Sequence, residues 1–215
     1  MPDPEPNLGP HIGTDEAGKG DYFGPLVVAA AYADELALTR LPQAGVRDAK
    51  GISLSRLWEM DKAVKQICPA FEVVLISPPR YNELHAKMRN LNRLLAWAHA
   101  RAIENTLSHT QCDLAVTDQF GDESYLEESL MKRGRQIRLL QRVRAEDDPA
   151  VAAASVLARA AFIRSLERLS SEIGLPLPRG ATHVLPAARD VMEKGGEDLL
   201  RRVAKVHFKT TKQVL

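Results

Sequence analysis

The sequence predicts an α/β domain with a central mixed β-sheet, flanked by helices and followed by a helical C-terminal part. Short apolar runs typical of strands alternate along the chain with longer segments of helical periodicity. The 215 residues are enough for one hydrophobic core, and the sequence contains no visible internal repeat. Residues 1–10 are polar and rich in proline, so we expect a disordered lead-in there and a single domain over residues 11–215.

Five segments have the composition of strands, with apolar, β-branched and aromatic residues between polar turns. The fourth is short and apolar, which is typical of a buried strand. The fifth alternates between apolar and polar residues. The predicted strands cover residues 11–15, 26–32, 71–76, 114–116 and 136–143.

Helices are predicted in the intervals between these strands. Pro78 and Pro149 mark two helix starts, because proline suits the first turn of a helix. Small residues at 152–155 permit close packing on a sheet. The predicted helices cover residues 55–67, a long region after Pro78 with Leu91, Leu94, Leu95, Ala98 and Ile103 on one face, residues 125–132, residues 150–169 and most of the remainder.

The net charge is close to zero, with 29 Lys and Arg against 28 Asp and Glu and a formal charge of +1. Bulk charge therefore does not indicate a nucleic-acid-binding protein. Basic residues nevertheless gather in two segments, which either contact phosphates or form a solvated charged face. The two groups are Arg133, Arg135, Arg138, Arg142 and Arg144, and, near the C-terminus, Arg201, Arg202, Lys205, Lys209 and Lys212.

The cysteine content and the apolar pattern indicate a cellular compartment. Cys68 and Cys112 lie in stretches that we interpret as buried, which suits a reducing compartment better than a disulfide framework. No apolar run reaches the ~18 residues of a membrane span, and the first residues lack the basic and apolar regions of a signal peptide. We therefore expect a cytoplasmic protein that is a monomer and has no membrane partner.

The segment from Gly13 to Pro25, with the sequence Gly-Thr-Asp-Glu-Ala-Gly-Lys-Gly-Asp-Tyr-Phe-Gly-Pro, is the most informative in the chain. Two adjacent carboxylates, Asp15 and Glu16, end a predicted strand. The glycines at 18, 20 and 24 then let another molecule approach the backbone. One molecule that such a loop would suit is a phosphodiester. The glycine spacing matches neither the dinucleotide-binding nor the P-loop pattern, which excludes both kinds of nucleotide cofactor. The alternative is an acidic strand end followed by a glycine turn.

Strand geometry constrains the two adjacent carboxylates. Asp15 and Glu16 point to opposite faces of a regular strand. Both can reach one metal ion only where the strand ends or bends, and Gly18 permits such a bend. With a slight bend, Glu16 would contribute through its backbone carbonyl or a bound water instead.

Further carboxylates follow two other predicted strands. Asp118 comes directly after the short fourth strand, where ligands of α/β sheets collect, although it could instead cap the next helix. Three acids precede Pro149: Glu146, Asp147 and Asp148. Helix capping accounts for Asp147 and Asp148 but does not explain Glu146. Oxygen ligands without a His or Cys metal spacing suit Mg²⁺ or Mn²⁺. Two such ions ~3.5–4 Å apart would activate a water and stabilise the leaving oxygen of a phosphodiester.

Several ordered segments carry a family resemblance. They are the run from Asp15 to Val28, Arg47-Asp48-Ala49-Lys50, Asp118-Gln119-Phe120, Ala150 to Arg159, Pro178-Arg179-Gly180-Ala181 and Val203 to Phe208. In this order they resemble the type 2 ribonucleases H over nearly the whole chain. Ribonuclease HII usually has arginine at the position of Lys19, so this lysine and the Asp-Tyr-Phe that follows favour ribonuclease HIII.

The resemblance implies a ribonuclease H fold and an endoribonuclease that hydrolyses the RNA strand of RNA/DNA hybrids. Two divalent ions, Mg²⁺ or Mn²⁺, would take part, and the products would carry 5′-phosphate and 3′-hydroxyl ends. Carried over by position, Asp15, Glu16 and Asp118 match three catalytic and metal-binding carboxylates, and Glu146 best matches the fourth. A shift of one or two residues would move the fourth assignment to Asp147 or Asp148.

The resemblance also implies substrate contacts. The Gly18-Lys19-Gly20 loop would lie along the RNA backbone, where family members sense 2′-hydroxyl groups through backbone groups. Lys19 would contact phosphate, and Lys50 either contacts phosphate or the active site or is simply exposed. His99 lies on the long apolar helix and is interpreted as a structural histidine.

Two features depart from the family pattern. Ribonuclease HIII usually carries an N-terminal substrate-binding domain resembling the TATA-binding fold, whereas residues 1–10 alone precede the first predicted strand here, so we expect weaker hybrid binding. The segment Asp48-Ala49-Lys50 lacks the family's serine.

Two other functions stay open. One is incision 5′ to a single ribonucleotide in duplex DNA, as in ribonuclease HII, which Lys19 disfavours. The other is a catalytically inactive hybrid-binding module, which the intact set of acids disfavours.

Overall fold

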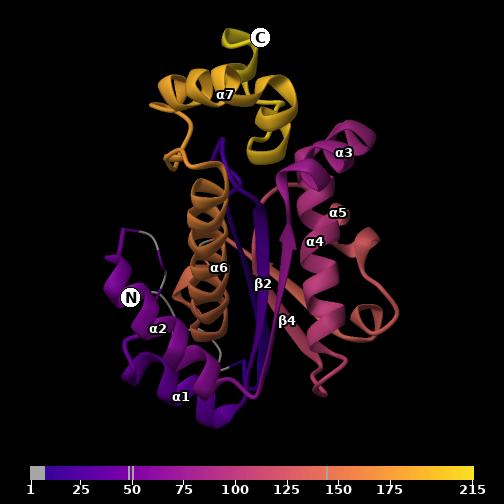
Figure 1. Ribbon diagram of the computed structural model, residues 1–215. Helices are drawn as coiled ribbons and strands as arrows, with labels where there is room; N and C mark the ends of the chain where they lie inside the picture. The colour runs from indigo at the N-terminus through magenta and orange to yellow at the C-terminus, as the bar shows by residue number, and fades with distance from the viewer. Residues whose placement is uncertain (1–7, 48, 50, 144) are drawn as a thin grey trace.

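The computed structural model describes residues 8–47, 49, 51–143 and 145–215 (Figure 1). At the centre of this part of the chain is a five-stranded mixed sheet in the order β3-β2-β1-β4-β5. β1 pairs antiparallel with β2 and parallel with β4. The predicted mixed sheet is therefore confirmed. Its strands are β1 (His11–Ala17), β2 (Leu26–Ala33), β3 (Ala70–Ile76), β4 (Leu114–Asp118) and β5 (Arg138–Arg142).

One face of the sheet is covered by α6 (Pro149–Ile173), with α1 (Glu35–Gln43) and α2 (Leu54–Ile67) packed against it (Figure 1). The helix approaches closely because Gly13 has no side chain: a Cβ there would stand 2.1 Å from the carbonyl carbon of Ala150. The sequence did not predict α1, a nine-residue helix that contains a proline.

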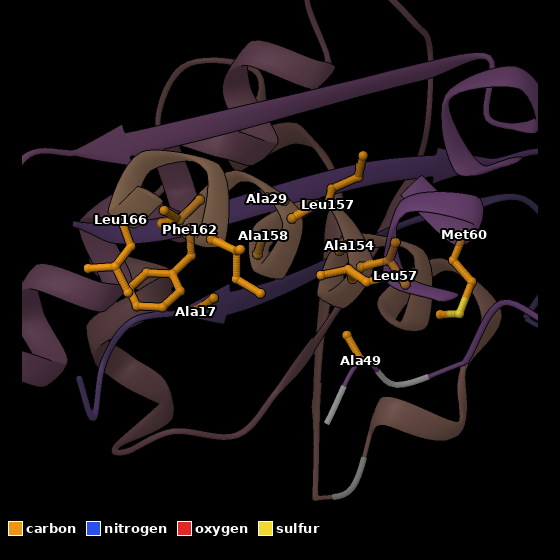
Figure 2. Close-up of a cluster of buried hydrophobic side chains, with 14 of the residues drawn as sticks. Ala17, Ala29, Ala49, Leu57, Met60, Ala154, Leu157, Ala158, Phe162 and Leu166 are labelled. Atoms are coloured by element: carbon orange, nitrogen blue, oxygen red, sulfur yellow. The ribbon is translucent and has the colours of Figure 1, made fainter. Parts of the chain in front are cut away.

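The apolar core between α6, α2 and the sheet is shown in Figure 2. Small side chains of α6 belong to this core, as the alanine-rich sequence predicted, and the larger Phe162 and Leu166 lie against the glycines of the loop after β1. Among the labelled side chains, Ala17 and Ala29 come from the sheet, Leu57 and Met60 from α2, and Ala154, Leu157, Ala158, Phe162 and Leu166 from α6.

The opposite face is covered by α4 (Leu91–Thr106), together with α3 (Pro78–Met88) and α5 (Glu123–Ser129) (Figure 1). The long helical region predicted after Pro78 is divided into α3 and α4. The division falls at Arg89, whose φ of 50° is left-handed, and Asn90 then caps α4. α5 begins two residues before the predicted helix at 125–132.

The C-terminal part is helical, as predicted. α7 (Leu185–Val203) is kinked at Gly195 and Gly196, and a 3₁₀ turn follows at Lys209–Gln213. Between these two elements the chain returns to the glycine-rich segment, where Phe23 and Ala204 form an isolated antiparallel bridge.

α6 is long and apolar enough to cross a membrane by length and composition alone. However, 78% of its apolar window is buried inside the protein, against β1 and β2 on one side and α2 on the other. The length and composition of α6 are therefore those of a core helix.

Candidate active site

Asp15 and Glu16 lie near the end of β1 and point to opposite faces of the sheet, as regular strand geometry requires. Asp15 bonds Ser155 of α6, and Glu16 contacts His99 of α4. Both carboxylates nevertheless line one pocket, because Gly18 turns the chain just beyond the strand with a φ of +85°. The pocket lining is Asp15, Glu16, Ala17, Gly18, Lys19, Gly20, Ala49, Ser155 and Arg159.

The carboxyl group of Asp15 is held between α6 and its own backbone. Its Oδ1 accepts a hydrogen bond of 2.8 Å from the amide of Glu16. Burial and the negative charge of Glu16 raise the pKa of Asp15 to about 6, while the hydrogen bond from Ser155 opposes this rise. Ser155 also accepts a bond of 3.4 Å from the amide of Ala49. It therefore links Asp15 to the backbone of Ala49.

The carboxylate of Glu16 is held by a buried histidine. The Nε2 atom of His99 lies 3.3 Å from Oε2 of Glu16, and its Nδ1 lies 2.8 Å from Oγ1 of Thr14. Lys19 adds a contact of 3.4 Å from its Nζ to Oε1 of Glu16. Burial would raise the pKa of Glu16, but the hydrogen bond and charge of His99, with those of Lys19, lower it to about 2. Glu16 is thus held as a carboxylate.

One ring nitrogen of His99 has a defined role. A carboxylate only accepts hydrogen bonds, so Nε2–H donates to Glu16, while the hydroxyl of Thr14 can serve Nδ1 as donor or as acceptor. The imidazole also stacks on Phe120, with 4.8 Å between ring centroids and 23° between planes. His99 therefore connects β1 to the chain just after β4. The interpretation as a satisfied structural histidine omitted this link to a candidate ligand.

Asp118 is the last residue of β4, and the strand register places it beside Asp15. Thr14 pairs with Thr117 in the parallel β1–β4 ladder, so the next residues on the two strands are the two aspartates. Oδ1 of Asp118 accepts a hydrogen bond of 3.3 Å from the amide of Ala145. The alternative role of Asp118 as a helix cap is wrong, because Asp122 caps α5.

The acidic run before α6 divides only in part as the sequence predicted: Asp148 caps the helix, whereas Asp147 lies with Glu146. Asp148 is the N-cap of α6, and its Oδ1 accepts hydrogen bonds from the amides of Ala150 and Val151. Glu146 lies in a 3₁₀ turn and lines a second pocket, with Asp147 and residues of the segment 42–52. It does not line the pocket of Asp15 and Glu16. The assignment of Glu146 as fourth acid thus stays a prediction.

The predicted acids are not gathered in one cage. In the ranges that the structure describes, no three His, Cys, Asp or Glu side chains are grouped closely enough to hold a metal ion. The donors around Asp15 and Glu16 still suit a hard divalent cation, because both are carboxylates and their like charges raise the pKa of Asp15. A cation between them would remove this repulsion.

The glycine loop has one glycine that the fold requires and one that it does not. A Cβ on Gly18 would stand 2.2 Å from the carbonyl oxygen of Pro25, and its φ is positive. Gly20 has an ordinary φ, and a Cβ there would meet no atom within 4 Å. Lys50 and Asp48 lie outside the described residues. Arg159 of α6 also lines the pocket, although we predicted no site role for it from the sequence.

Solved structures share this arrangement of strands and helices. Bst-RNase HIII, solved in complex with Mn²⁺, is 32% identical, with a TM-score of 0.89 over 97% of this chain and 70% of that chain. The RNase H3 of Aquifex aeolicus is 28% identical, with a TM-score of 0.75 over 92% of this chain and 72% of that chain. Fold and site together define an endonuclease of the ribonuclease H class.

Sequence comparison identifies the family within the ribonuclease H class. The ribonuclease HII family model matches residues 12–211, so the chain belongs to the ribonuclease HII family. Ribonuclease HIII of Protochlamydia amoebophila is 44% identical over 210 residues, which are 97% of this chain and 69% of that protein. Ribonuclease HIII of Chlamydia pneumoniae is 40% identical over 214 residues, which are 98% of this chain and 72% of that protein.

Proposed function

We propose that this chain hydrolyses the RNA strand of RNA/DNA hybrids with two divalent metal ions, Mg²⁺ or Mn²⁺. The observation that carries the proposal is the pairing of Thr14 with Thr117, which sets Asp15 and Asp118 side by side at the end of β4. The pocket that Asp15 lines, which does not include Asp118 in its lining, also contains the glycine loop, and glycines let a polymer backbone approach closely. Glu16 and Glu146 complete the proposed ligand set, and the Mn²⁺ in the Bst-RNase HIII structure supports the metal.

The metal ions, when bound, would supply an activated water and stabilise the leaving oxygen. In the reaction, water adds to phosphorus and the bond to O3′ breaks. One fragment then ends in a 5′-phosphate, and the proton goes to O3′ of the other. The protein holds Glu16 deprotonated through His99 and fixes Asp15 through Ser155. Lys19 lies where it can compensate the charge of a backbone phosphate.

The identity of the fourth acid is open to a direct comparison. Glu146 follows Ala145, whose amide bonds Asp118, and this connection favours it. Asp147 is the competing carboxylate, because it lies next to Glu146 and lines the same pocket, whereas Asp148 caps α6. Glu146→Gln and Asp147→Asn should be assayed side by side: the variant that loses more than about a hundredfold in kcat identifies the ligand. Equal, small losses in both would reject the four-acid proposal.

The test of activity uses three labelled substrates: a long RNA/DNA hybrid, duplex DNA with one embedded ribonucleotide, and plain DNA. We expect cleavage of the long hybrid with Mg²⁺ or Mn²⁺ and its loss in Asp118→Asn. Asp113→Asn is the matched control, because Asp113 is an exposed aspartate just before the same strand.

Three other outcomes would change the proposal. Cutting only 5′ to the single ribonucleotide would favour the ribonuclease HII-type incision. Hybrid binding without cleavage of any substrate would favour an inactive binding module. Metal-independent cleavage would exclude the proposed chemistry.

A further inference from the structure

The second half of the glycine loop is attached to a segment from the far end of the chain. Gly24 donates its amide proton to the carbonyl of Val203 at 2.9 Å, and Lys205 donates its own to the carbonyl of Tyr22 at 2.9 Å. Phe23 and Ala204 bridge between these two bonds. The backbone after α7 thus follows the loop over its last residues.

The side chain of Lys205 makes the central contact of this attachment. Its Nζ lies 2.7 Å from the carbonyl oxygens of both Asp21 and Gly24 and 3.5 Å from that of Phe23. Lys205 has no exposed surface, and its Nζ is 5.8 Å from the centre of the Tyr81 ring. Three carbonyl acceptors match the three N–H groups of an ammonium.

A fully buried lysine needs a specific reason. Burial lowers the pKa of Lys205, and the negative charge of Asp21 only partly opposes this shift. The sequence placed Lys205 in a basic cluster that contacts phosphate or solvent, and the structure excludes both roles for this member of the cluster. The carbonyl oxygens that meet at its Nζ all belong to the loop, so its partner is the loop itself.

The carbonyls matter because of what the first half of the loop does. Gly18, Lys19 and Gly20 line the pocket of the candidate carboxylates, and residues 21–24 continue directly from them. Carbonyl oxygens gathered beneath this loop would repel a polyanion unless a cation compensates them. Asp21 also accepts a bond of 2.6 Å from the amide of Gly180, which holds the loop from a second side.

We propose that Lys205 is a positioning residue for substrate binding: it fixes the Gly18–Gly20 loop in the form that receives the RNA strand, without touching that strand. The proposal rests on the function proposed for the loop. It assigns a role in hybrid affinity to a residue remote from the carboxylates. Metal binding and the chemical step should depend little on Lys205.

The first test compares Lys205→Met with wild type and with Lys194→Met, a change at an exposed lysine of α7 that belongs to neither basic cluster. We expect Lys205→Met to raise KM for a long hybrid about tenfold and to change kcat less than about twofold. Its affinity for Mn²⁺, measured by calorimetry without substrate, should stay unchanged. Lys194→Met should match wild type. A lowered kcat with unchanged KM, as a merely destabilised protein would show, would overturn the proposal.

Hydrogen exchange gives a second readout that needs no catalysis. The amides of Tyr22 and Gly24, which bond Gly180 and Val203, should exchange faster in Lys205→Met than in wild type. Where that variant does not fold, Lys205→Arg replaces it. The exchange rates of these two amides and the KM for a hybrid must then either both rise or both keep their wild-type values. A change in only one of these two quantities would overturn the proposal.

Failure of the proposed function would look different. A wild-type chain that neither binds nor cuts a hybrid refutes that function, while the exchange rates still show whether Lys205 fixes the loop. Unchanged exchange at Tyr22 and Gly24 in a folded Lys205→Met protein would refute the proposal for Lys205 itself.

Discussion

His99 is the residue whose two ring nitrogens connect a candidate ligand to the protein core. It bonds Glu16 and Thr14 and stacks on Phe120. His99→Phe keeps the aromatic stack but removes both hydrogen bonds, so Glu16 loses the donor that holds its pKa low. We expect kcat/KM on a long hybrid to fall about 10- to 100-fold and the metal concentration for half-maximal activity to rise.

The matched control for this change is His109→Phe, because His109 is an exposed histidine that pairs with Glu72 away from the pocket. Activity and metal dependence of the control should equal those of wild type. Wild-type kinetics in His99→Phe would show that the contact with Glu16 has no role in orienting that carboxylate.

Two glycines of the same loop should respond differently to the same substitution. Gly18→Ala forces a side chain into left-handed backbone and within 2.2 Å of the Pro25 carbonyl oxygen, which should destabilise the fold by at least about 1–2 kcal/mol. Gly20→Ala meets open space and should leave the melting temperature unchanged. If the loop lies on the RNA backbone, Gly20→Ala should instead raise KM for a hybrid. Thermal unfolding and hybrid kinetics of both variants test this, and normal KM in Gly20→Ala would argue against the loop as a substrate contact.

At the scale of elements, β1 is joined to the start of α6 by a buried pair. Nε2 of His11 lies 2.9 Å from Oδ1 of Asp148, which also caps α6. Burial opposes protonation of His11, but Asp148 raises its pKa, while His11 and the helix amides lower the pKa of Asp148 against the effect of burial. His11, whose pKa is raised, stabilises the fold fully below the ordinary histidine pKa near 6.5. Asp148, whose pKa is lowered, stabilises it fully above the ordinary aspartate pKa near 4.

The pair should therefore stabilise the protein most between about pH 4 and 6.5. Asp148→Asn keeps a capping side chain but removes the charge, so it should lower the free energy of unfolding near pH 5 by about 1–3 kcal/mol. The difference from wild type should shrink as the pH rises through the raised pKa of His11, and again as it falls through the lowered pKa of Asp148. Denaturant unfolding without metal, at several pH values, measures this, and a difference that does not vary with pH would contradict it.

At the scale of the whole molecule, local patterns predicted the elements better than the contacts between them. The strand runs are recognisable because apolar residues dominate them, but α1 contains Pro42, which argues against a helix. Asp15, Glu16 and the glycines lie close together in the sequence, so the sequence alone predicted them as one site. It did not predict His99 as the partner of Glu16, because 83 residues separate the two. The same reason hid the contacts of Lys205 with a loop more than 180 residues earlier.

Metal binding should be visible in the stability of the whole molecule. A cation that binds only the folded chain at about 100 times its dissociation constant stabilises it by about 2.7 kcal/mol, or roughly 5–10 °C in melting temperature. Mn²⁺ should raise the melting temperature of wild type by this amount. It should have little effect on Asp15→Asn, which should already melt higher than wild type without metal because the repulsion from Glu16 is gone. Equal Mn²⁺ shifts in both proteins would place the ion elsewhere.

The register of β1 also determines when the protein can acquire activity during folding. β1 pairs with β2 across a short loop, but its partnership with β4 joins residues about a hundred positions apart. Closing the longer loop costs more entropy and occurs later in the search for the native state. A refolding chain should therefore form the hairpin of β1 and β2 before Asp15 meets Asp118. If these two carboxylates act together as we propose, the return of hydrolysis reports the joining of β4 to β1 rather than the start of the sheet.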